Sequence, residues 1–205
     1  MIGGIKMADI SVFGDSVLKG VIYENNTYKV SKNRFSNICE DILGISIENA
    51  LIKARAYSKN VSIPVFAMDD NLYLENVPEE NQPGMYVRRV NGKRLNDEEM
   101  IKHYTNLVKE YGTNGKLTCR WVYGMAVINN GQETTYSWSK EDFYMVDKPS
   151  NKINPGYPLN TISINKKLNK YFTDITEEDK AILQEDESDV VEFIAKSLKN
   201  RSEYQ

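Results

Sequence analysis

Two carboxylates and one lysine stand where they could take part in catalysis. Asp69 directly follows the apolar segment 63–67, and a carboxylate beyond a buried strand is the usual position of a catalytic acid in an α/β sheet. Glu48 and Lys53 lie on one predicted helix, residues 46–59. Carboxylate oxygens can hold a divalent cation, and a lysine can neutralise a phosphate. These residue types are therefore compatible with metal-assisted hydrolysis of a phosphate-bearing substrate.

The same residues also have purely structural interpretations. Asp69-Asp70-Asn71 is good turn composition, Glu48 in a first helical turn is favourable to the helix dipole, and Lys53 can be a solvated lysine. We interpret His103, which lies between two predicted core positions, as a structural residue. Two cysteines form neither a disulfide framework nor a zinc site, so Cys39 and Cys119 are expected to be small buried hydrophobes.

Five helices are predicted to frame these residues. The clearest runs from Asn96 to Tyr111, because Asn96 and Glu99 have the spacing of a capping box and Gly112 follows the last turn. Its apolar stripe is Met100, Tyr104, Leu107, Val108 and Tyr111. Ser46 is expected to cap the helix 46–59, after a short helix that ends at Gly44. Thr176 with Asp179 caps another helix, and the stripe of the last is Val190, Val191, Ile194 and Leu198.

The predicted strands alternate with these helices. Residues 10–14 and 63–67 are short apolar strands, and Asn129-Asn130-Gly131 between the β-rich segments 117–128 and 133–138 predicts a hairpin. A third strand, 143–146, follows the hairpin. The order predicts a mixed α/β fold with an antiparallel section in the second half.

Five collinear segments between about Ser46 and Leu198 resemble the inosine triphosphate pyrophosphatase family, the non-canonical purine nucleoside triphosphate pyrophosphatases. The matching segments are Ile47-Glu48-Asn49-Ala50-Leu51-Ile52-Lys53-Ala54, residues 64–73, Pro83-Gly84-Met85-Tyr86-Val87-Arg88-Arg89, Gly156-Tyr157-Pro158-Leu159-Asn160 and residues 172–180. The resemblance implies one α/β domain over residues 1–205, with an elongated, twisted mixed sheet flanked by helices. It also implies a homodimer in the cytoplasm.

The resemblance further implies Mg²⁺-dependent cleavage of a nucleoside triphosphate to a monophosphate and pyrophosphate. Glu48 and Asp69 would hold the Mg²⁺, with Asp69 as the catalytic carboxylate. The implied nucleotide-binding residues are Lys53, Arg88, Tyr157, Asn160 and Lys180.

Three departures from the family pattern predict altered specificity or reduced activity. Met68 replaces an acid, Asn160 replaces an aspartate, and Gln184-Glu185-Asp186 replaces a Ser-His-Arg run whose basic pair contacts the nucleobase. A nucleotide-binding homologue without turnover is the alternative. Residues 8–45 resemble instead the first block of GDSL/SGNH esterases, with Ser16 at the nucleophile position, but the late Asp-x-x-His of that family is missing.

Charge and hydropathy exclude other classes of function. The net charge is −3, from 26 basic and 29 acidic residues, so the basic excess that a nucleic-acid polymer requires is absent. No apolar run reaches the roughly 18 residues of a membrane span, and no signal peptide is predicted. With its thiols unpaired, the chain is expected in a reducing cytoplasm. The family resemblance implies that its small-molecule partner is a nucleoside triphosphate.

Overall fold

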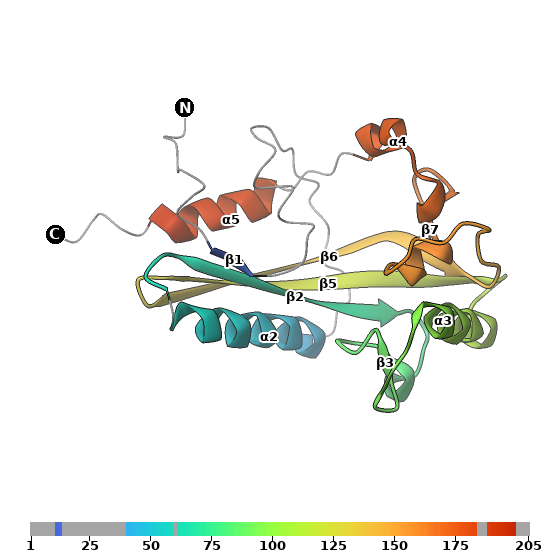
Figure 1. Cartoon of the computed structure of the whole chain (residues 1–205), viewed down its shortest axis with the longest axis horizontal. Helices are drawn as coiled ribbons and strands as arrows, with labels where there is room; N and C mark the ends of the chain where they lie inside the picture. The colour runs from blue at the N-terminus through green and yellow to red at the C-terminus, as the bar shows by residue number, and fades with distance from the viewer. Residues whose placement is uncertain (1–10, 14–39, 60, 184–187, 200–205) are drawn as a thin grey trace. The chain divides into compact units, whose positions relative to one another are not determined.

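The structure, a computed structural model, describes residues 11–13, 40–59, 61–183 and 188–199 (Figure 1). The predictions for Ser16, Cys39 and the segment 184–186 lie outside the described residues. The chain divides into two compact units. The first unit comprises residues 1–70, 123–138 and 185–205, and the second comprises residues 71–122 and 139–184.

Eight described strands form two sheets. The larger has the order β1-β2-β5-β6-β7-β8, and the smaller consists of β3 and β4. The bounds are β1 (Ser11–Phe13), β2 (Val65–Leu74), β3 (Arg89–Val90), β4 (Lys93–Arg94), β5 (Lys116–Asn129), β6 (Gln132–Val146), β7 (Ser163–Asn165) and β8 (Lys170–Tyr171). β1 pairs with β2 in parallel, whereas β6, β7 and β8 pair in antiparallel fashion. The mixed α/β fold with its antiparallel second half is therefore confirmed.

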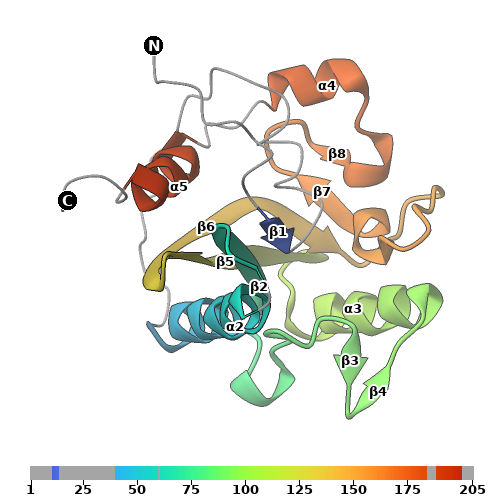
Figure 2. The same cartoon turned by 60° about the vertical axis from the view of Figure 1, so that its left-hand side comes forward.

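In the first unit, the helices α2 (Glu40–Ser58) and α5 (Ser188–Lys199) cover opposite faces of the sheet (Figures 1 and 2). Ala50 and Ala54 of α2 pack with Val65 and Ala67 of β2 in one core cluster. The α5 side chains pack in another cluster, together with Phe66. Alternate residues of β2 thus face different helices, as strand geometry requires.

The predicted break in α2 is wrong. The helix starts at Glu40 and runs through Gly44, and Ser46 is fully buried in its interior instead of capping an end. Ser46, Ala50 and Ala54 form a stripe of small residues, spaced by four, that faces the sheet. Gly124 of β5 lies directly under this stripe, in close approach to the backbone at Ser46 and Ile47. Tertiary packing therefore outweighs the cost of a glycine in a helix.

β2 is longer than the predicted strand 63–67, because it continues to Leu74. Leu72 and Leu74 are buried in the core of the second unit, which gives the extra residues a reason to stay extended. The chain turns at Asn76, whose φ is 61°, and not at Asp69-Asp70-Asn71. The turn interpretation of Asp69 is therefore wrong.

The predicted hairpin is confirmed. Asn130 and Gly131 join β5 to β6 with φ values of 51° and 80°, the left-handed conformations that a two-residue hairpin turn demands. The segment 143–146 is the end of β6 and not a separate third strand.

The second unit is organised around the helix α3 (Asp97–Tyr111), whose capping box is confirmed. The Asn96 side chain accepts from the Glu99 amide at 2.8 Å, and the Glu99 carboxylate accepts from the Asn96 amide at 2.9 Å. The predicted stripe packs into the core, with Tyr111 only partly buried. The helix α4 (Glu177–Ile182) has the predicted Thr176–Asp179 capping box.

Three short 3₁₀ helices complete the described elements: η2 (Glu79–Asn81), η3 (Pro158–Thr161) and η4 (Phe172–Asp174). In α5, Val190 and Ile194 are buried as predicted, but Val191 is exposed. Among the described helices, none is both long and apolar enough to cross a membrane.

Candidate functional site

Asp69 lies at the centre of a polar cluster between β2 and α2 in the first unit. The Asn49 amide donates to Oδ2 of Asp69 at 2.8 Å, and the Lys53 ammonium forms an ion pair with Oδ1. Lys53 also donates to the carbonyl of Met68 at 2.9 Å. The Asp69 side chain is 15% exposed and that of Lys53 is 44% exposed. The cluster is therefore held firmly from inside and remains open to solvent from one side.

The sequence places these residues together through two simple periodicities. Asp69 shares the α2-facing side of β2 with Val65 and Ala67, because alternate strand residues face the same way. Asn49 and Lys53 are four residues apart, so they lie on one side of α2. Lys53 is consequently a partner of Asp69, while its side chain stays 44% exposed to solvent. Asn49 was missed, although its spacing from Lys53 was a usable signal.

Glu48 precedes Asn49 on α2 and is exposed. Since α2 begins at Glu40, Glu48 lies in the middle of the helix, and its interpretation as a first-turn glutamate is wrong. Among the described residues, no group of three or more histidine, cysteine, aspartate or glutamate side chains is gathered for a metal. One or two carboxylates nevertheless fit Mg²⁺, which takes most of its ligands from water and substrate phosphates. Asp69 already attracts a cation, the Lys53 ammonium.

A second group of candidate residues lies in the second unit and surrounds Gly156. Arg88 donates to Asp97 Oδ1 at 2.7 Å and to the Gly156 carbonyl at 2.9 Å. The Gly156 amide donates to Asp97 Oδ2 at 2.7 Å. Both backbone groups of Gly156 are thus bound in one closed ring, which we call the Gly156 clamp (Arg88, Asp97 and Gly156). The predicted nucleotide-binding residue Arg88 here holds a loop of its own chain.

The clamp fixes the backbone next to Tyr157, whose side chain is 61% exposed. Gly156 has a φ of 84°, in the left-handed region that favours glycine. Asn160 follows in η3, and its backbone amide donates to the Tyr157 carbonyl at 3.1 Å. Tyr157 and Asn160 therefore lie on one turn, whose start is held by the Gly156 clamp. Lys180 lies on α4, exposed and paired with Glu177 at 2.6 Å.

Replacing Asp97 with asparagine should loosen the clamp, because a neutral amide loses the charge-assisted bonds that the carboxylate makes. Hydrogen bonds to a charged acceptor are stronger than those to a neutral one, so hydrogen exchange at the Gly156 amide should rise severalfold. Exchange measured by mass spectrometry over the peptide 150–160 tests this. Glu98→Gln, which removes the same charge from the same exposed helical turn, should leave the exchange unchanged. Equal exchange in both variants would show that Asp97 does not hold the loop.

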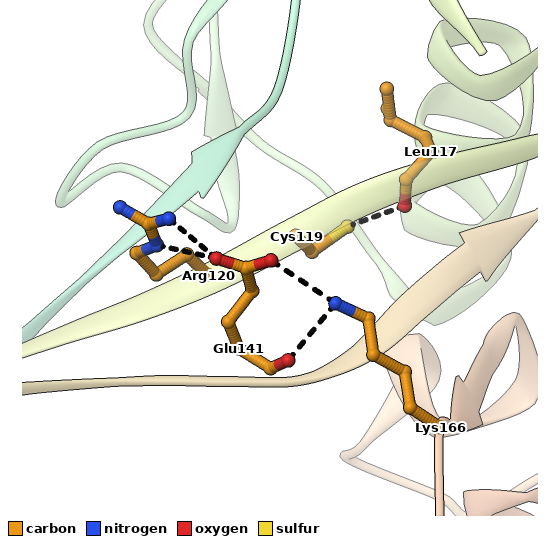
Figure 3. A network of polar contacts seen from close by, with 5 residues as sticks. All are labelled: Leu117, Cys119, Arg120, Glu141 and Lys166. Atoms are coloured by element: carbon orange, nitrogen blue, oxygen red, sulfur yellow. Dashed lines mark hydrogen bonds and ion pairs between the residues drawn. The ribbon is translucent and has the colours of Figure 1, made fainter. Parts of the chain in front are cut away.

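Cys119 and His103 have structural environments. Cys119 is buried, its thiol donates to the Leu117 carbonyl at 3.1 Å, and burial raises its pKa to about 12, which excludes a thiolate at neutral pH (Figure 3). Burial lowers the pKa of His103, which packs edge-on against Tyr104 with ring centroids 5.1 Å apart. The structural interpretations of both residues agree with these environments.

Figure 3 also shows a three-residue ionic network on β5, β6 and the residues after β7. Glu141 accepts from Arg120 through one carboxylate oxygen and from Lys166, at 3.2 Å, through the other. Lys166 also donates to the backbone carbonyl of Glu141 at 3.0 Å. Since the three residues lie on different segments, their ion pairs link β5, β6 and the residues after β7.

Three solved structures show the class of fold. The Staphylococcus aureus Ham1 protein is similar to the chain with a TM-score of 0.55 and 18% identity, over 86% of this chain and 82% of that one. A HAM1 protein from Coxiella burnetii has a TM-score of 0.52 and 20% identity, over 74% and 75%. The nucleoside-triphosphatase / dITP/XTP pyrophosphatase of Mycobacterium abscessus has a TM-score of 0.51 and 17% identity, over 86% and 81%. The fold is that of the Ham1 proteins.

A model of the Ham1 family matches residues 6–188. The chain belongs to the Ham1 family, as its resemblance to the inosine triphosphate pyrophosphatases predicted. The match includes residues 8–45, and none of these comparisons supports the esterase resemblance of that segment.

One curated relative is the dITP/XTP pyrophosphatase of Bacillus subtilis (strain 168). It is 29% identical over 133 residues, which are 65% of this chain and 65% of the relative. The chain is therefore a homologue of a nucleotide pyrophosphatase, with an alignment that spans somewhat less than two thirds of the relative's length.

Proposed function

We propose that the chain is a Mg²⁺-dependent nucleoside triphosphate pyrophosphatase that acts on non-canonical purine nucleotides. The single observation that carries the proposal is the cluster of Asp69, Lys53 and Asn49. It combines a carboxylate, a cation and an amide on one helix and one strand, within a chain of the Ham1 family. Cytoplasmic location and a homodimer are proposed on family membership alone.

In the proposed reaction, water adds across the bond between the α and β phosphates and yields a monophosphate and pyrophosphate. Asp69 orients the water or holds the cation, and Glu48 supplies a further carboxylate from α2. When the ion pair with Asp69 opens, the Lys53 ammonium can interact with the negatively charged triphosphate. Bound Mg²⁺ would neutralise the phosphate oxygens.

The exposed ring of Tyr157 offers a stacking face for the base, and the Gly156 clamp holds its backbone in place. Asn160 follows on the same turn and offers both donors and an acceptor to the nucleotide. Lys180 borders the base in this proposal. The amide at 160 and the replaced segment 184–186 are the reason why we propose an altered base preference and reduced activity.

A panel of nucleoside triphosphates that includes dITP, ITP and XTP tests the proposal. With Mg²⁺, the purified protein should release pyrophosphate from at least one of them, and chelation of the metal should stop the release. The absence of any release above that of the Asp69→Asn variant would refute the enzymatic function.

A nucleotide-binding protein without turnover is the second candidate. The observation that favours it is the ion pair of Lys53 with Asp69, because this carboxylate is already occupied by a cation of its own chain. The neighbouring residue, Met68, supplies no second acid. In that case nucleotides should raise the unfolding temperature of the protein without being hydrolysed. The same panel distinguishes the two functions.

A further inference from the structure

The β3–β4 hairpin of the second unit places two arginines directly opposite each other. Arg89 pairs with Arg94 in the antiparallel register, and Val90 pairs with Lys93. Asn91 and Gly92 form the turn with φ values of 49° and 77°, so this register is fixed by a tight two-residue loop. Like charges directly opposite one another destabilise a strand pair. The hairpin therefore carries an electrostatic cost that nothing in its own two strands relieves.

Nearby acidic groups do not neutralise this pair. Lys93 forms an ion pair with Glu99, and Arg88 forms one with Asp97. Within the described part of the chain, neither Arg89 nor Arg94 has an acidic partner. Both arginines are exposed, and their charges remain available to a ligand.

These arginines line a hollow of about 300 Å³ together with Met85, Tyr86 and Arg88. The volume lies at the lower end of the range for small-molecule sites. Tyr86 is 57% exposed and Met85 is 41% exposed, so an apolar and aromatic rim stands beside the guanidinium groups. Arginine forks bind phosphate through paired hydrogen bonds, and a tyrosine ring can stack on a base.

We propose that this hollow is a binding site for a nucleoside diphosphate or a similar small phosphate ester. Arg89 and Arg94 bind the phosphate groups, and the anion relieves their mutual repulsion. Tyr86 packs against the base. The Asp69 cluster and this hollow share no residue, so the site does not depend on the proposed hydrolytic activity.

Binding of inorganic pyrophosphate and of ADP, measured by calorimetry in the presence of a chelator, tests the site. Both ligands should bind, and the double variant Arg89→Ser/Arg94→Ser should weaken both by about tenfold or more. The matched variant Lys102→Gln/Lys109→Gln removes two exposed positive charges from α3 of the same unit and should bind as the wild type does. Tyr86→Ala should weaken ADP and leave pyrophosphate unchanged.

A residue-specific measurement places the ligand. Phenylglyoxal modifies accessible guanidinium groups, and saturating pyrophosphate should protect Arg89 and Arg94 from it, as seen by peptide mass spectrometry. The proposal is wrong if wild type binds neither ligand, if the arginine and lysine double variants weaken binding equally, or if these two arginines stay reactive at saturation. None of these outcomes depends on hydrolysis, so the proposed function can fail while this site stands, and the reverse also holds.

Discussion

Replacing Asp69 with asparagine should lower pyrophosphate release by about 100-fold or more, the range in which a positioned proton acceptor contributes to catalysis. The substitution keeps the size of the side chain and the hydrogen bond from Asn49 can re-form, but the charge that pairs with Lys53 is lost. A neutral amide binds a divalent cation more weakly than a carboxylate does and does not accept a proton from water. The initial rate of pyrophosphate release with the best nucleotide of the panel measures the effect.

Asp70→Asn is the matched control for this variant. It removes the same charge one residue along β2, on the strand face opposite to Asp69. We expect its rate to stay within about threefold of the wild type, a change worth less than 1 kcal/mol of transition-state stabilisation. A large loss of activity in Asp70→Asn together with an active Asp69→Asn would reverse the assignment of the catalytic carboxylate.

Gly124→Ala should be the most destabilising small substitution in the first unit. A Cβ at this position would lie 2.5 Å from the Ile47 backbone nitrogen and closer still to the backbone at Ser46. Because the obstacle is helix backbone and not a flexible side chain, α2 would have to move away from the sheet. Overpacking of this kind costs about 1–3 kcal/mol and sometimes more, which chemical denaturation can measure.

Gly44→Ala, in the helix α2 that packs on Gly124, should instead increase the stability of the protein slightly. Its added Cβ would meet no atom within 4 Å, and alanine is favoured over glycine in a helix interior by about 1 kcal/mol. The variant should therefore unfold at a slightly higher denaturant concentration than the wild type. If Gly44→Ala destabilised the protein as much as Gly124→Ala, close helix–sheet contact would not be the cause.

The sequence predicted those parts of the fold that local chemistry determines. The capping boxes at Asn96 and Thr176 and the Asn130-Gly131 turn were found because a few neighbouring side chains set their geometry. The same signal, Asn91-Gly92 between two short strands, was present in the β3–β4 hairpin and was not used. That hairpin could have been predicted.

Long-range packing decided what the sequence could not reveal. Gly44 and Ser46 read locally as the end of one helix and the start of another, but the stripe of small residues facing Gly124 keeps α2 continuous. The sequence predicted that Asp69 follows a strand. In the structure Asp69 lies within β2, because the burial of Leu72 and Leu74 extends the strand beyond it. In the candidate site, Asp69 and Lys53 were predicted, but the roles of Asn49 and Asp97 depend on contacts between distant segments.

The Gly156 clamp also determines how the Tyr157 turn responds to acid. The hydrogen bond from Arg88, followed by that from the Gly156 amide, holds the pKa of Asp97 below its ordinary value. A carboxyl whose pKa is lower in the folded protein contributes stability that is fully present above its unfolded value, about 4, and is lost as the pH falls through the folded value. At neutral pH the clamp is therefore closed, and proton uptake does not release the turn. Changes of activity near neutrality have to arise from other groups or from the phosphates of the substrate itself.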